Sequence, residues 1–396
     1  MSARALRRLA PALLVLGSVI AALAVAEIGL RLITGVRSSP RSHMTADPVH
    51  HHRLRASWSR TVLGAPFETN SQALRDHEIT MPKPPGVFRI FMLGDSFTEG
   101  AGFTLETTAP KLLETFLNER RCGRRFEVIN AGVASYSPIL EYLLLTRVGL
   151  GLDPDLIVLN FDMTYVHDDW VRTAIARLDA RGLPVSVPPD RRRETAVILP
   201  PLRKPAALRF LEPVELLLHR SLLYQNFRTS GLGEKLFGPA KLTYDRLEAL
   251  GLIGNVQYDT LAVTRDGDFP QHRAAWALTE RYIVGIRDAA RARGIPFVLA
   301  MYPHAHQISE VESPEGRLKL GVGPGLYLSE RPFQILEALG RREEFPVINL
   351  LAFFRDRERT DWPLYRRDDF HHDFSSVFVL AEGLRNELLA RRLVPC

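Results

Sequence analysis

The residue best placed for covalent chemistry is Ser96, in the sequence Gly94-Asp95-Ser96. The apolar run 88–93 before it predicts a buried strand, and the glycine allows a sharp turn after that strand. A serine at a turn between a strand and a helix can expose its hydroxyl while its amide stays free. Those two groups serve as a nucleophile and an oxyanion donor. The alternative is a polar turn whose serine only caps a helix.

A partner for this serine stands near the C-terminus. His371 follows Asp368 and Asp369, and the amphipathic run 377–391 after it predicts the last helix. A carboxylate beside a histidine can orient the imidazole and stabilise its protonated form, so that the histidine can deprotonate a serine. A solvated acidic turn is the alternative. Either aspartate could pair with His371, and a third register pairs Asp369 with His372.

The elements that would position these side chains alternate between strand and helix. Strands are predicted at 88–93, 126–130, 156–160, 296–301 and 346–350, and helices at 105–120, 138–148, 274–293, 333–341 and 377–391. This order predicts an α/β fold, a three-layer α/β/α sandwich with a central parallel sheet. The candidate residues follow strand ends at the carboxyl edge, where such sheets bind ligands.

The order of these motifs resembles the SGNH, or GDSL-type, hydrolase family over residues 86–396. Gly94-Asp95-Ser96 matches the nucleophile block, Asn130-Ala131-Gly132-Val133 matches the second block, and the Asp-His pair matches the last. The resemblance implies a flavodoxin-like SGNH fold and a serine esterase that needs no cofactor and no metal. It also implies that the amides of Ser96 and Gly132 stabilise the oxyanion.

The third family block is altered in this chain. The family carries Gly-x-Asn-Asp after the third strand, and its asparagine side chain is a further oxyanion donor. Direct alignment places that donor on Asp162, or on Tyr165 if the loop is longer. An ionised Asp162 would repel an oxyanion, so Asp162 could take this role only if protonated, and Asn160 or Tyr165 is the alternative donor.

The family also bears on the register of the catalytic acid. The commoner family spacing points to Asp368, and a subset of members points to Asp369. We favour His371 over His372 as the base because a small residue usually follows five positions later, and Ser376 stands there.

Composition and charge narrow the choice of partners. The hydrophobic content of 46% is ample for a core, and the net charge is +6. Arginines cluster at 120–125 and 191–193, where they could meet anionic lipids, acidic glycans or nucleic acid, or form a solvated basic face. No nucleic-acid-binding motif accompanies them, so no nucleic-acid partner is expected. No Cys/His spacing indicates a zinc site.

The N-terminus predicts a membrane anchor. A basic cytoplasmic tail at 1–8 precedes a signal-anchor helix at 9–33, whose uncharged part, 9–26, has about the minimum length for a membrane span. The positive flank predicts that the remainder is exported to the periplasm or the cell exterior. Cleavage near 22–26 would instead release the exported part, but the apolar residues that continue to 33 favour an uncleaved anchor.

Two further segments bear on the substrate. Residues 34–85 predict a linker and a strap against the domain, and the strand–helix alternation stops at about 170–271. We interpret the latter as a cap inserted over the catalytic edge, with a surface decoration as the alternative. Residues proposed to line the pocket are Asp95, Tyr165, His304, His306 and Gln307. For His304, His306 and Gln307, the alternative is that they are only polar groups of a loop.

Only two cysteines occur, Cys122 and Cys396. In an exported chain they could form a disulfide between the C-terminal tail and the end of the first helix of the domain, or they could remain free thiols.

The compartment and the resemblance together predict a membrane-anchored serine esterase or O-acyltransferase. Its substrate would carry an ester-linked acyl group, preferably acetyl, as a small molecule or an envelope or secreted polysaccharide. Two alternatives remain: a catalytically inactive glycan-binding or assembly protein of the same fold, and a lipid esterase with an apolar cap.

Overall fold

The computed structural model describes most of the C-terminal part of the chain. The described residues are 17–19, 21–29, 43–189, 270–317, 330–358, 363–367 and 369–396. The chain divides into two units, one formed by His43–Leu202 and Glu248–Cys396 and the other by Met1–Ser42 and Arg203–Leu247. All described strands lie in the first unit.

The second unit is described only as helix at 17–19 and 21–29. Within the described ranges, no helix is both long enough and apolar enough to span a membrane. The predicted cytoplasmic tail at 1–8, much of the predicted anchor at 9–33 and most of the predicted cap at 170–271 lie outside those ranges.

A five-stranded parallel sheet forms the centre of the first unit. Its strands, in spatial order, are β6 (Arg125–Gly132), β5 (Val87–Gly94), β7 (Leu156–Phe161), β10 (Phe297–Met301) and β11 (Val347–Asn349). Numbered along the chain, this is the order 2-1-3-4-5 of flavodoxin-like folds. Every residue of β7 and β10 is buried, as expected for strands covered on both faces. The predicted three-layer fold is confirmed.

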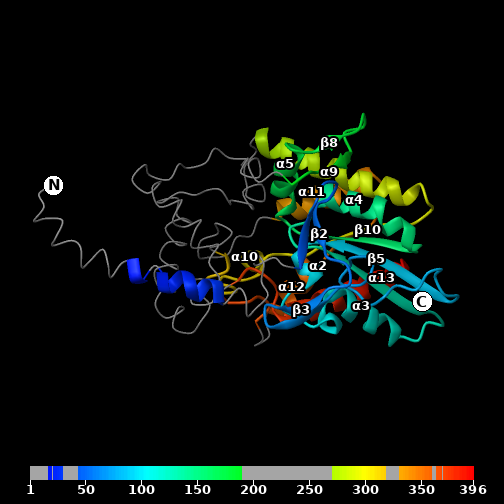
Figure 1. Cartoon of the computed structure of the whole chain (residues 1–396). Helices are drawn as coiled ribbons and strands as arrows, with labels where there is room; N and C mark the ends of the chain where they lie inside the picture. The colour runs from blue at the N-terminus through cyan, green and yellow to red at the C-terminus, as the bar shows by residue number, and fades with distance from the viewer. Residues whose placement is uncertain are drawn as a thin grey trace, which may run out of the picture. The chain divides into compact units, whose positions relative to one another are not determined.

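Helices cover both faces of the sheet, as Figure 1 shows. They are α3 (Ala109–Asn118), α4 (Pro138–Arg147), α5 (Tyr165–Thr173), α9 (Pro270–Arg291), α11 (Arg331–Arg342), α12 (Leu351–Glu358) and α13 (Phe374–Ala390). On one face, α13 packs against α3 and α12. On the other, α9 packs against α4 and α5, and Arg342 of α11 pairs with Glu280 of α9 at 2.8 Å.

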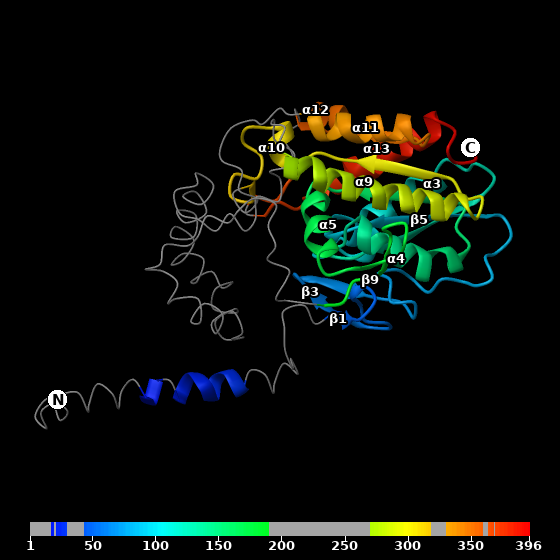
Figure 2. The same ribbon diagram turned by 90° about the horizontal axis from the view of Figure 1, so that it is seen from above.

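Residues 43–68 form two antiparallel hairpins within the segment predicted as an irregular linker and strap. The first joins β1 (Met44–Asp47) to β2 (His51–Leu54), and the second joins β3 (Ser59–Val62) to β4 (Ala65–Glu68). The first hairpin lies beside β9 (Pro184–Ser186), as Figure 2 shows, and Val187 N–H donates to the Val49 carbonyl at 2.8 Å. The strap is therefore part of the folded unit.

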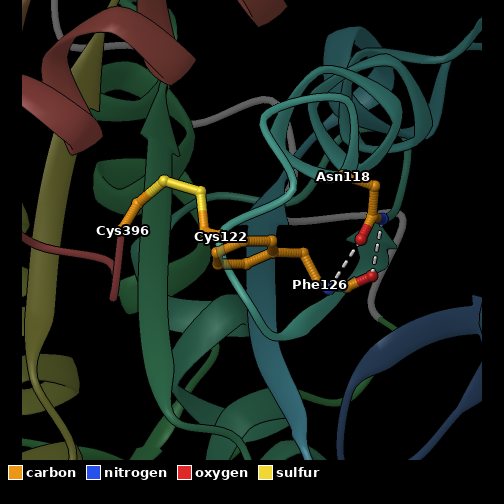
Figure 3. The surroundings of a disulfide bond; sticks show 4 residues. All are labelled: Asn118, Cys122, Phe126 and Cys396. Carbon is orange, nitrogen blue, oxygen red and sulfur yellow. Dashed lines mark hydrogen bonds between the residues drawn. A yellow bond between two sulfur atoms is a disulfide. The ribbon is translucent and has the colours of Figure 1, made fainter.

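A disulfide joins Cys122 to Cys396, with Cα atoms 4.8 Å apart (Figure 3). The loop that carries Cys122 is closed by Asn118, whose Oδ1 accepts from Phe126 N–H and whose Nδ2 donates to the Phe126 carbonyl, both at 2.9 Å. The end of α3, the start of β6 and the C-terminus are thus tied together, which is the pairing considered from the sequence.

Candidate active site

The turn that carries Ser96 joins β5 to the one-turn helix α2 (Ser96–Glu99). An added Cβ at Gly94 would overlap the Thr98 hydroxyl, so the turn requires glycine there. The side chain of Asp95 caps the helix by accepting from Phe97 N–H at 2.9 Å. The local sequence therefore places the Ser96 hydroxyl at the carboxyl end of β5.

Ser96, His371 and Asp369 form a hydrogen-bonded triad. Ser96 Oγ lies 2.8 Å from His371 Nε2, and His371 Nδ1 lies 2.6 Å from Asp369 Oδ1. The same carboxylate oxygen accepts from the His371 backbone N–H at 3.1 Å. This arrangement lets Nε2 take the serine proton while Asp369 holds the ring and balances the charge that forms. Asp368, the alternative acid, lies outside the described residues.

Backbone and ring contacts fix the loop that carries His371 beside Ser96. Tyr365 and His372 form an isolated antiparallel bridge, and Arg366 N–H donates to the His371 carbonyl at 3.1 Å. The Phe370 ring stacks on the His371 ring with centroids 4.3 Å apart. The His371 and Asp369 side chains are 28% and 32% exposed, so both are accessible to solvent.

The Gly132 amide is already engaged. It donates to Asn130 Oδ1 at 3.0 Å, so it does not serve as the oxyanion donor that the resemblance implies. An added Cβ at Gly132 would overlap the Glu99 backbone nitrogen. The glycine is needed because β6 packs directly against α2. Ser96 N–H, by contrast, has no hydrogen-bond acceptor among the described residues.

A different amide is presented by the loop after β6. Ser135 has a left-handed backbone, with φ of 64°, and its N–H has no acceptor within the described part of the chain. The loop lies against α2, because Ala134 N–H donates to Glu99 Oε1 at 3.2 Å. Val133 N–H also donates to the Gly94 carbonyl at 3.1 Å. The sequence interpretation missed Ser135, since a positive φ at a serine leaves no signal in its residue type.

Asn160 and Tyr165 are buried beneath the site. Asn160 Nδ2 donates to Thr98 Oγ1 at 2.9 Å, and the Tyr165 hydroxyl donates to the Asn160 carbonyl at 3.2 Å. Both side chains are fully buried. They brace α2 and the end of β7, so neither is placed to donate to an oxyanion or to contact a substrate as the sequence suggested.

Asp162 lies in a buried polar cluster where the family has its third block. Its carboxylate accepts from Thr164 N–H at 2.8 Å and from the Tyr302 hydroxyl at 3.1 Å, and His304 Nε2 lies 2.9 Å away. Burial raises the pKa of Asp162, but His304 and the Thr164 donors outweigh burial and bring the pKa below its ordinary value. Burial and repulsion by Asp162 raise the pKa of Asp95 well above its usual range. Asp162 is therefore the charged member of this pair of acids.

The remaining predicted pocket residues are buried as well. Asp95, His304, His306 and Gln307 are each at most 5% exposed. The chain turns into the one-turn helix α10 (Ala305–Ile308) after β10, and Gln307 Oε1 accepts from His304 N–H at 2.8 Å. The interpretation that these residues line the pocket is corrected for Asp95, His304 and Gln307, because Asp95 caps α2, Gln307 closes the turn and His304 lies against Asp162. Among the described residues, no group of His, Cys, Asp and Glu could hold a metal ion.

Comparison with known proteins returns solved structures alone. No family model matches the chain, and no curated protein matches it. The acetyl xylan esterase AlAXEase is 12% identical with a TM-score of 0.39, over 76% of this chain and 100% of the other. TesA is 11% identical with a TM-score of 0.36, over 76% and 97%. AlinE4, an SGNH-hydrolase family esterase, is 15% identical with a TM-score of 0.31, over 79% and 100%. Identities and TM-scores this low support no argument about the function of this chain.

Proposed function

We propose that the chain is a serine esterase of the SGNH type that forms an acyl-enzyme on Ser96. The observation that carries the proposal is the hydrogen-bonded triad: Ser96 Oγ lies 2.8 Å from His371 Nε2, and His371 Nδ1 lies 2.6 Å from Asp369 Oδ1. A serine within hydrogen-bonding reach of a carboxylate-oriented histidine is the arrangement that nucleophilic acyl transfer needs. The same contacts favour an enzyme over the inactive glycan-binding alternative, for which the serine would be turned away.

The triad geometry supports acyl transfer through Ser96. His371 takes the Ser96 proton at Nε2 as the oxygen attacks the ester carbonyl, and the Asp369 carboxylate stabilises the resulting imidazolium. The proton then passes to the departing alcohol oxygen. Water, or an acceptor hydroxyl, then attacks the acyl-enzyme as His371 takes its proton. His371 returns that proton to Ser96 Oγ as the acyl–oxygen bond breaks, which releases the carboxylic acid or the new ester and restores Ser96.

The oxyanion would be stabilised by backbone amides. Ser96 N–H and Ser135 N–H both lie at this edge, and neither has an acceptor among the described residues. Preorganised amides of this kind act where negative charge develops and cost no reorganisation during the reaction. In this proposal Ser135 replaces Gly132 as the second donor.

For the substrate, we propose an O-acetyl group on an envelope or secreted polysaccharide, with transfer of the acyl group to a sugar hydroxyl as an accompanying activity. The support is the compartment predicted from the N-terminus and the motif resemblance. A lipid ester is the other candidate, and the cap that would distinguish the two lies largely outside the described residues. Release of acetate from acetylated glycans, compared with release of fatty acid from glycerides, separates the two.

We also propose that residues 9–33 anchor the protein, with the catalytic unit exported. The support is the basic flank and the apolar run of the sequence. Resistance of the protein to alkaline extraction from membranes, together with protease access to the catalytic unit from outside the cytoplasm, would support this placement. Release of the protein by alkali would argue against it.

The first test is covalent labelling of the full chain with a fluorophosphonate, followed by intact mass measurement. One adduct on the wild type and none on a folded Ser96→Ala variant would support an activated Ser96. Ester hydrolysis retained by that variant would remove Ser96 from the mechanism.

A further inference from the structure

A histidine of the first hairpin holds a peptide at the edge of the candidate site. His52 Nε2 lies 2.8 Å from the Ala134 carbonyl oxygen. That carbonyl belongs to the same planar peptide unit as the Ser135 N–H, and in a trans peptide the two groups point in opposite directions. A bond that fixes the Ala134 carbonyl therefore also fixes the direction of the Ser135 amide.

We propose that His52 is a positioning residue that aims the Ser135 N–H at the oxyanion formed during attack by Ser96. This inference rests on the proposed function and extends it to the N-terminal hairpin. The first hairpin would then help to orient the oxyanion donor as well as pack against the domain.

The direction of the hydrogen bond follows from its acceptor. A carbonyl oxygen only accepts, so His52 Nε2 must carry a proton. His52 Nδ1 lies 2.8 Å from His51 Nδ1, and in the neutral pair His51 donates to His52. The donors then run in one direction, from His51 through His52 to Ala134. A chain of this kind polarises each successive bond, which strengthens the peptide N–H as a donor to an anion.

The peptide on the other side of Ser135 is held too. The Arg172 guanidinium donates to the Ser135 carbonyl and, at 3.2 Å, to Ser137 Oγ. Arg172 is itself paired with Asp168 at 3.1 Å. Both peptides that flank Ser135 are thus fixed by side chains, which accounts for a serine held at a left-handed φ of 64°.

The hairpin is in turn fixed to the loop that it holds. The Tyr136 hydroxyl donates to the His52 carbonyl at 2.7 Å, and its ring meets the His52 imidazole edge-on at 5.1 Å. Substituting His52 by phenylalanine would keep this ring contact and remove the hydrogen bonds of the imidazole, among them the donor to Ala134 and the contact with His51. That substitution therefore separates hydrogen bonding from packing.

The experiment measures three His52 variants of the full chain. For His52→Phe we expect kcat on p-nitrophenyl acetate and the second-order rate of fluorophosphonate labelling to fall together by roughly tenfold to a hundredfold, with KM within about twofold. His52→Gln, whose amide nitrogen can occupy the place of Nε2, should restore most of the rate. His52→Asn, whose amide is too short, should not.

A matched control tests whether the hairpin matters only for stability. His50 lies in the same segment but bonds Asp47, at 3.1 Å. His50→Phe should lower Tm and leave the labelling rate unchanged. Labelling of His52→Phe at the wild-type rate would overturn the positioning role. Equal losses of labelling rate in His52→Gln and His52→Asn, in proportion to their losses in Tm, would overturn it as well. If Ser96→Ala labels as the wild type does, the proposed function fails and this inference fails with it.

Discussion

His371 and His372 are consecutive in the chain but lie in opposite surroundings. The His371 ring contacts Ser96 and Asp369, whereas His372 is 2% exposed and neither of its ring nitrogens has a hydrogen-bond partner among the described residues. The rings around His372 belong to Phe97, Tyr302, Phe354 and Tyr365. Because the Asp369 carboxylate contacts His371 Nδ1 and neither ring nitrogen of His372, the register that pairs Asp369 with His372 is ruled out.

Stability should depend on pH through His372. Burial, with repulsion from His304, lowers the pKa of His372 well below its ordinary value of 6.5. Below about pH 6.5 the unfolded chain binds a proton there and the fold does not, so the free energy of unfolding falls by up to about 1.4 kcal/mol per pH unit. His372→Leu should remove this part of the slope in urea denaturation between pH 7.5 and 5.5. Equal slopes in the two proteins would contradict the prediction.

The identity of the catalytic acid can be tested by replacing each aspartate. Asp369→Asn should lower kcat about a thousandfold, because an amide cannot balance the imidazolium of His371. Asp368→Asn should stay within about threefold of the wild type. Steady-state hydrolysis of p-nitrophenyl acetate, with thermal melts to check folding, measures both. The reverse ranking would return the role to Asp368.

The proposed role of the Ser135 amide predicts that its side chain is dispensable. Ser135→Gly should keep kcat within about threefold and raise the free energy of unfolding by about 1 kcal/mol, since glycine adopts a positive φ freely. Ser135→Val should lower both, because a β-branched residue resists this conformation. Kinetics and urea denaturation test the pair. A loss of activity in the glycine variant as large as in the valine variant would show that the hydroxyl is needed.

The buried cluster around Asp162 should contribute to stability. Asp162→Asn leaves His304 without its carboxylate and should cost about 3 to 5 kcal/mol in the free energy of unfolding. The control is Glu330→Gln, which breaks the exposed pair with Arg355 and should cost less than about 1 kcal/mol. Chemical denaturation at neutral pH compares them. Similar losses in both variants would mean that burial adds nothing to the Asp162 contacts.

The disulfide should stabilise the fold by closing a long loop. Cys122 and Cys396 are separated by 274 positions, and removing such a cross-link should lower the free energy of unfolding by about 2 to 5 kcal/mol. Denaturation with and without reductant measures the loss, and a Cys122→Ser/Cys396→Ser variant should not respond to reductant. A wild type that is insensitive to complete reduction would contradict the prediction.

The sequence could not identify Ser135, the second oxyanion donor in our proposal. Gly132 is conspicuous as a residue type, but its amide is used by Asn130 two positions earlier. Ser135 carries no such mark, because its left-handed backbone depends on His52 and Arg172, which come from other parts of the chain. For the same reason, the hairpin at 43–54 gave no sign of its link to the site.

The sequence by itself determined the layered α/β fold, the position of Ser96 after a predicted strand and the position of His371 before the last predicted helix. Hydrophobic periodicity and turn residues are local properties, and they survive in a single sequence. Only the tertiary structure decided that Asp369 meets His371, that Asp162 is buried against His304, and which amides remain without acceptors. Those outcomes depend on contacts between distant segments and on hydrogen bonds competing for the same groups, which no local pattern records.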